Sequence, residues 1–125
     1  FTEVIASCLQ VLMELRKIAG IIIYPFVGPS TVQGYKRLAG AIFEQVTKKQ
    51  VESTEKFSQL AKELIDKYHK PVLSTGWLVD PTDATVMILK NIAGIPLYFS
   101  TGRASRAMAA LVEYSAFKNN KDFQL

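Results

Sequence analysis

The strongest constraint in the sequence is a phrase that occurs twice. Leu12–Gly28 aligns with Val86–Gly102 at an offset of 74 residues, with eight identities in seventeen positions. After a shorter corner the likeness continues, because Lys36–Ile42 matches Arg106–Val112. Repetition of one supersecondary unit is the signature of duplication, so we expect two copies of a helical hairpin. Chance similarity between two apolar helices is the alternative, because the chain holds no third copy.

Both copies carry pairs of small residues where helices are expected to pack. Four such pairs occur, one in each expected helix: Ala19-Gly20, Ala39-Gly40, Ala93-Gly94 and Ala109-Ala110. Small side chains let helix backbones approach closely, which favours association in lipid. In water, a helical glycine costs about 1 kcal/mol relative to alanine. We therefore predict that the three glycines of these pairs and Ala109 are helix-packing positions.

Apolar periodicity and the positions of prolines indicate four helices. Apolar residues recur at three- and four-residue steps over Val4–Tyr24, which predicts a first helix that stops near Pro25. Residues 31–70 hold no proline, so one continuous helix of about forty residues is permitted there. Two further helices are expected from about residue 81 to residue 100, with a bend at Pro96, and from about residue 103 to residue 118.

The middle of the second expected helix differs from its ends. Thr47–Lys56 is almost wholly polar apart from Val51. Glutamates placed four residues before lysines in this region are typical of an exposed helix. We expect the segment to face water as part of a long charged arm. A break near Thr47 or Ser53 is the alternative to one continuous helix.

These elements define an all-α fold in a single domain of 125 residues. Residues 1–70 form a hairpin with the long extended helix, 71–82 form a linker, and 83–118 form the second hairpin. Residues 119–125 are a tail that has no reason to be ordered alone. Trp77 is the only tryptophan and is predicted to anchor the linker on the core, with a bilayer interface as the alternative setting for its ring.

Residues that carry catalysis are sparse in this chain. The single histidine, His69, and the single cysteine, Cys8, cannot complete a zinc site of the His/Cys type. His69 is expected to cap a helix C-terminus rather than to act as a base. We expect no catalytic, cofactor-binding or metal site, and we predict that the protein is not an enzyme.

Two glycine-containing corners could hold an anion on the backbone amides of a helix start. They are Gly28–Gly34, assisted by Lys36, and Ser100–Ser105, assisted by Arg103 and Arg106. Neither corner has the glycine-lysine-serine or glycine-lysine-threonine ending of a P-loop. Plain helix capping is the favoured interpretation of both corners.

Composition points to a membrane or to a protein partner. Apolar residues make up 49% of the chain and charged residues 21%, with a net charge of +4. The basic residues are interleaved with acids, so nucleic acid is not expected as a partner. Full membrane spans are disfavoured, because Ile18–Gly28 covers about 17 Å of a hydrocarbon core about 30 Å thick. In the second copy, Lys90 and Asn91 interrupt the apolar stretch Ala84–Thr101.

In these features the chain resembles the small supernumerary subunits of mitochondrial inner-membrane complexes, such as ATP synthase and the respiratory-chain complexes. The likeness is one of character over the whole chain: basic, single-cysteine, helical with charge-interrupted apolar stretches, and without the initiator methionine, which a removed presequence would explain. No single motif carries it.

The resemblance implies a non-catalytic structural or assembly subunit of a membrane-associated complex. Its partners would be other subunits of that complex, with lipid contact, and it would lie in the mitochondrial inner membrane or peripheral to it. No cofactor is implied. Two alternatives from other classes stay open. One is a soluble helical adaptor or assembly factor, and the other is a small carrier of lipids or other hydrophobic molecules that uses the space beside Gly20 and Gly94.

Overall fold

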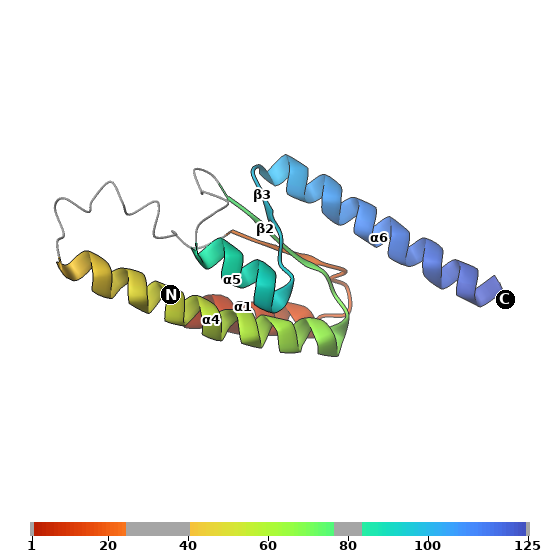
Figure 1. Ribbon diagram of the computed structural model, residues 1–125. Helices are drawn as coiled ribbons and strands as arrows, with labels where there is room; N and C mark the ends of the chain where they lie inside the picture. The colour runs from red at the N-terminus through yellow and green to blue at the C-terminus, as the bar shows by residue number, and fades with distance from the viewer. Residues whose placement is uncertain (1, 25–40, 77–83, 125) are drawn as a thin grey trace.

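The computed structural model describes residues 2–24, 41–76 and 84–124, and in these ranges helices alternate with short strands (Figure 1). The elements in chain order are α1 (Thr2–Glu14), β1 (Ile21–Ile23), α4 (Ala41–Tyr68), β2 (Val72–Thr75), α5 (Ala84–Ala93), β3 (Leu97–Tyr98) and α6 (Thr101–Gln124). The described part of the chain is therefore an α/β structure that is mostly helical.

The expected all-α fold is wrong, because β1, β2 and β3 form a parallel sheet in that order. Ile21 pairs with Val72 in the first ladder, and Ser74 pairs with Leu97 in the second. A short apolar run such as Ile21–Ile23 has no period of its own, so it reads equally well as the end of a helix or as a buried strand. The sheet shows that it is a strand.

Three helices cover one face of the sheet and α6 lies over the other (Figure 1). The core on the three-helix side contains Leu9 and Met13 of α1, Phe57, Ala61 and Leu64 of α4, Leu89 of α5, and the inward residues Ile21, Ile23, Val72 and Ile95. Parallel sheets are stable when both faces are covered, because both faces carry apolar side chains. The α6 helix supplies cover for the second face.

The first helix ends at Glu14 rather than near Pro25, and a lysine from a distant part of the chain caps it. Lys70 Nζ donates to the carbonyl oxygens of Met13 at 2.7 Å and Leu15 at 2.6 Å. The last carbonyls of a helix have no partner within it, and a cation there also meets the negative end of the helix dipole. The cap joins the end of α1 to the corner between α4 and β2.

His69 forms that corner with its backbone. It has the left-handed φ of 55°, and its amide donates to the Ile65 carbonyl at 2.8 Å. A left-handed residue directly after a helix is the usual way to stop it. His69 thus ends α4 through its backbone conformation, and the expected dipole-favoured cap by its side chain stays a prediction. Pro71 follows, and residues 72–75 of the expected linker form β2.

The third expected helix stops at Ala93, so the predicted bend at Pro96 is wrong. Gly94 has a φ of 66° and occupies the left-handed position after the helix. Pro96 lies just before β3, where its carbonyl accepts the Ser74 amide at 2.9 Å. Residues 119–124 of the expected tail belong to α6, which continues through Gln124.

The repeated phrase therefore encodes a helix followed by a strand, not a helical hairpin. Leu12–Gly28 contains the last three residues of α1 and all of β1, whereas Val86–Gly102 contains most of α5, all of β3 and the start of α6. The alignment matches Ile23 with Leu97, and both residues pair with Ser74 from opposite sides of β2. Positions that correspond in the sequence thus correspond in the sheet.

The polar middle of α4 is exposed on one side and packed on the other, which corrects the expectation that the whole segment faces water. The helix runs without a break through Thr47 and Ser53. Thr54 is 2% exposed and Ser58 is 0% exposed, and the Thr54 hydroxyl donates to the Gln50 carbonyl at 2.7 Å. A small hydroxyl that bonds to its own helix can be buried at little cost, so packing is possible here.

Ser58 generates a stability prediction, because within the described residues its buried hydroxyl has no hydrogen-bond partner. Replacing Ser58→Ala removes an unsatisfied buried group and should raise the free energy of unfolding by up to about 1 kcal/mol. Thr54→Val is the matched control, since it removes a hydroxyl that is bonded, and it should lower stability by about 1 kcal/mol. Urea denaturation followed by circular dichroism measures both. A destabilised Ser58→Ala protein would contradict the assignment.

Candidate functional site

The second half of α6 is held by little of the described chain. Ala104 in its first turn is fully buried, and Ala107 and Met108 are half-buried. Every side chain from Ala109 to Lys118 is exposed. Figure 1 shows α6 continuing past the sheet toward the C-terminus. The helix is thus attached by its start and presents the rest of its length as surface.

Four large apolar side chains lie on this exposed part of α6. They are Leu111, Val112, Tyr114 and Phe117, which are 42%, 37%, 65% and 64% exposed. Single exposed apolar residues are common, but a cluster of them on one helix indicates an interaction site. The cluster defines the candidate site as an interaction surface.

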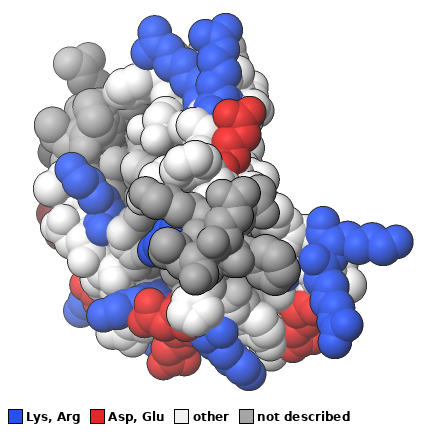
Figure 2. Space-filling view, turned by 90° about the vertical axis from the view of Figure 1, so that its right-hand side faces the viewer, with Lys and Arg blue, Asp and Glu red and all other residues white. Residues whose placement is uncertain are grey.

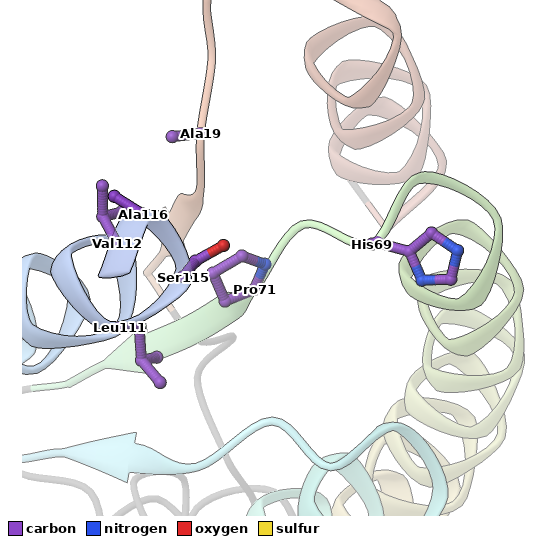
Figure 3. Close-up of a pocket in the computed structure, with 7 residues that line it drawn as sticks. All are labelled: Ala19, His69, Pro71, Leu111, Val112, Ser115 and Ala116. Atoms are coloured by element: carbon purple, nitrogen blue, oxygen red, sulfur yellow. The ribbon is translucent and has the colours of Figure 1, made fainter. Parts of the chain in front are cut away.

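A groove separates α6 from the body of the protein (Figure 3). It has a volume of about 250 Å³ and is lined by Ala19, His69, Pro71, Leu111, Val112, Ser115 and Ala116. Leu111 and Val112 come from α6, whereas Ala19, His69 and Pro71 come from the segments just before β1 and β2. Most of these side chains are apolar, so the groove suits one or two apolar side chains of a partner. In Figure 3 the Ser115 hydroxyl points toward Pro71, whereas the His69 ring points away from the α6 side chains.

The packing of Met108 holds α6 against the body beside this groove. A Cβ atom built on Gly20 would collide with Met108 Sδ, would lie 2.9 Å from Met108 Cε, and would lie 3.3 Å from Pro71 Cγ. Gly20 therefore lets the thioether lie directly on the backbone before β1. The close approach predicted at Gly20 is present, but its neighbour is a side chain of α6 and Gly20 is not in a helix.

The other predicted packing positions are placed differently. Gly94 ends α5, and a Cβ added to it would meet nothing within 4 Å. Ala109 is exposed on α6, next to the apolar cluster. Gly40 and Trp77 lie outside the described residues. The structure thus brings Gly20 to the site, puts Ala109 at its margin and keeps Gly94 away from it.

The sequence indicated the apolar residues of this site but not the groove. Leu111, Val112 and Tyr114 follow the helical period and were assigned to the fourth expected helix, as was Met108. Periodicity predicts that such residues share a face, but it does not reveal whether another element covers that face. The groove itself depends on the distance between α6 and the β1 and β2 segments, which no local pattern encodes.

A second cavity lies at the carboxyl ends of the strands, where ligands bind in open α/β sheets. Its volume is about 200 Å³, and its lining is Tyr24, Thr75, Gly76, Phe99, Ser100 and Thr101. The Ser100 hydroxyl accepts a hydrogen bond from the Arg103 amide at 3.2 Å. This contact is the helix cap that was the favoured interpretation of this corner. Anion contact at Ser100–Ser105 stays a prediction. The other corner, with Lys36, lies outside the described residues.

Charges do not form a single patch on the face shown in Figure 2. Lysine and arginine side chains are spread over this face, and acids lie among them both near the top and along the lower part. Within residues 2–24, 41–76 and 84–124, no group of three or more His, Cys, Asp or Glu side chains is arranged to hold a metal ion. Across the same residues, no helix combines the length and the apolar character needed to cross a membrane.

Comparison with known proteins gives no match to any protein-family model, to any curated protein or to any solved structure. Functional conclusions therefore rest on the geometry of this chain.

The contact between Gly20 and Met108 can be tested by a double-mutant cycle. Gly20→Ala should displace the flexible Met108 side chain and cost on the order of 1 kcal/mol of stability. The loss should shrink when Met108→Ala is also present, since the obstacle is then gone. Urea denaturation of the two single variants and the double variant gives the coupling energy.

Gly94→Ala is the matched control for this cycle. It has open space around its added Cβ, so its cost of about 1 kcal/mol comes from the left-handed φ alone. That cost should be the same with and without Met108→Ala. Additive effects of Gly20→Ala and Met108→Ala would contradict the proposed contact.

Proposed function

We propose that this protein is a non-catalytic assembly module, a subunit that binds another protein through α6 and the groove beside it. The observation that carries the proposal is the uncovered apolar cluster Leu111, Val112, Tyr114 and Phe117 on the exposed part of α6. The sheet needs only the start of α6 as cover, so the apolar character of the remainder calls for a separate explanation. A protein partner supplies one.

The energetics of the cluster support binding of a protein. Burying a large apolar side chain contributes roughly 1.5–3 kcal/mol relative to leaving it exposed. Aromatic residues often dominate interfaces, and Tyr114 and Phe117 are the most exposed members of the cluster. Leu111 and Val112 border the groove, which can receive side chains from the partner. By the helical period, Phe117 lies on the opposite side of α6 from the groove, so a partner that uses both the anchors and the recess contacts more than one side of the helix.

Charges around the cluster indicate the partner's character. Between residues 101 and 118 of α6, Arg103, Arg106 and Lys118 are exposed beside one acid, Glu113. Rim charges of one sign favour a partner whose rim has the opposite sign, chiefly by raising the association rate. We infer an apolar partner surface with an acidic margin.

The setting of the partner is a separate proposal. Membership in a mitochondrial inner-membrane complex, with lipid contact, is supported by the resemblance in composition and charge. The argument from small residues in helices loses its support, because Gly20 and Gly94 are not inside helices. A soluble adaptor would use the same surface with a soluble partner. The carrier alternative loses its binding space at Gly20, where Met108 and Pro71 lie.

The decisive experiment compares two pairs of substitutions on different faces. Tyr114→Ser with Phe117→Ser removes both aromatic anchors of α6, and each should cost on the order of 1–2 kcal/mol of binding. Both side chains are exposed, so the unfolding transition should be unchanged. Ile42→Ser with Met87→Ser removes exposed apolar area from α4 and α5 and serves as the matched control.

The measurement is affinity capture in mild detergent, with the stoichiometry of any co-purified protein determined by mass spectrometry. Hydrogen exchange of α6 is then compared in the free and bound protein. Wild type and the control variant with Ile42→Ser and Met87→Ser should retain a protein at fixed stoichiometry and protect α6, whereas the α6 variant should lose it. Equal retention by the α6 variant would reject this surface. Release of the partner complex from membranes by salt alone would reject the membrane setting.

A further inference from the structure

A second uncovered surface lies on α1, far from α6 in the sequence. The helix packs on α4 with a face that includes Leu9 and Met13, which are 1% and 0% exposed. The opposite side carries Val4, Cys8, Val11 and Leu15, all of them exposed. Val4 is 64% exposed, Val11 57% and Leu15 48%. These values are high for apolar residues that recur on one helix.

The four exposed residues form one stripe, because their spacing of four, three and four residues follows the helical period. Leu15 continues the stripe just past the last residue of α1, and its amide donates to the Leu12 carbonyl at 3.3 Å. Beside the middle of the stripe lies a shallow apolar hollow of about 360 Å³, lined by Ser7, Cys8, Val11 and Leu12. The stripe therefore offers projecting side chains and a recess next to them.

The stripe is complementary to itself when a second copy runs antiparallel to it. Its members are symmetric about the midpoint between Leu9 and Gln10, so Val4 meets Leu15 of the second copy, and Cys8 meets Val11 of the second copy. An interface with two-fold symmetry requires this kind of match, since each residue must fit what its symmetry mate presents. The two hollows then receive the Val11 side chains.

The charges at the two ends of α1 favour antiparallel pairing over parallel pairing. Glu3 makes the first turn of α1 acidic, whereas Arg16 and Lys17 make the turn after the helix basic despite Glu14. Antiparallel pairing brings the acidic end of each helix to the basic end of the other, and parallel pairing would bring like ends together. The dipoles of the two helices also favour the antiparallel arrangement, because the positive end of each lies beside the negative end of the other.

We propose that a second copy of this chain binds the α1 stripe, which makes the protein a homodimer with antiparallel α1 helices at its centre. The inference goes beyond the proposed function, because it rests on a different surface and needs no contact with α6. An assembly module of this kind would present two α6 surfaces, one from each copy.

Cysteine cross-linking tests the register of the pairing. Val11→Cys places an introduced thiol opposite Cys8 of the second copy, so oxidised glutathione should convert the protein into a disulfide-linked dimer while being reduced to glutathione. Gln10→Cys is the control, because this exposed position lies on the same helix but outside the stripe. We expect dimer on non-reducing gels for Val11→Cys, at several times the yield of Gln10→Cys. Equal yields from the two variants would overturn the register.

Sedimentation equilibrium tests the dimer without cross-linking. Wild type should show a concentration-dependent dimer, and Val11→Asp should weaken dimerisation at least about tenfold, because it buries a charge at the centre of the interface. Tyr114→Ser with Phe117→Ser should dimerise like wild type, so the result is independent of partner binding by α6. If wild type stayed monomeric up to about 100 µM, any dimer would be weaker than ordinary specific interfaces, and the proposal would be overturned. An unchanged dimer of folded Val11→Asp would overturn it too.

Discussion

The two hydrogen bonds from Lys70 to the end of α1 fix the corner on which the rest of the structure depends. The ammonium binds the carbonyls of Met13 and Leu15, which have no partner inside the helix. His69 makes this reach possible, because its left-handed backbone stops α4 and turns the chain toward α1. Directly after the lysine, the Pro71 carbonyl accepts the Ile21 amide at 3.0 Å. One corner thus ends two helices and begins the pairing of β1 with β2.

The register set at this corner decides which side chains face which layer. Ile21, Ile23 and Val72 point toward the three helices, so the alternate residues Leu73 and Thr75 point toward α6. A slip of one residue would exchange these sets and leave both layers badly packed. Leu73 is 3% exposed, which shows that the start of α6 already covers its side of the sheet. The sheet is therefore covered without the later turns of α6, and those turns are available for binding.

Helical periodicity predicted where helices exist more successfully than where they end. The continuous α4 and the start of α6 follow from apolar spacing and from a capping serine, Ser100. The strands were missed because each holds fewer than five residues, too few to show a period. Thr54 was assigned to water by its polarity, although short hydroxyl side chains fit a helix interface. Of the candidate site, the apolar residues were visible in the sequence, whereas the groove depends on contacts between distant segments.

The repeated phrase shows how one substitution between the copies changes the sheet. Ile22 of the first copy aligns with Pro96 of the second. Proline has no N–H to donate, so β3 begins to pair with β2 only at Ser74, whereas β1 pairs from Val72 onward. The Pro96 carbonyl accepts both the amide of Ser74 at 2.9 Å and its hydroxyl at 2.8 Å, which offsets part of the lost pairing. The same phrase therefore makes both outer strands, and Pro96 makes the second one shorter.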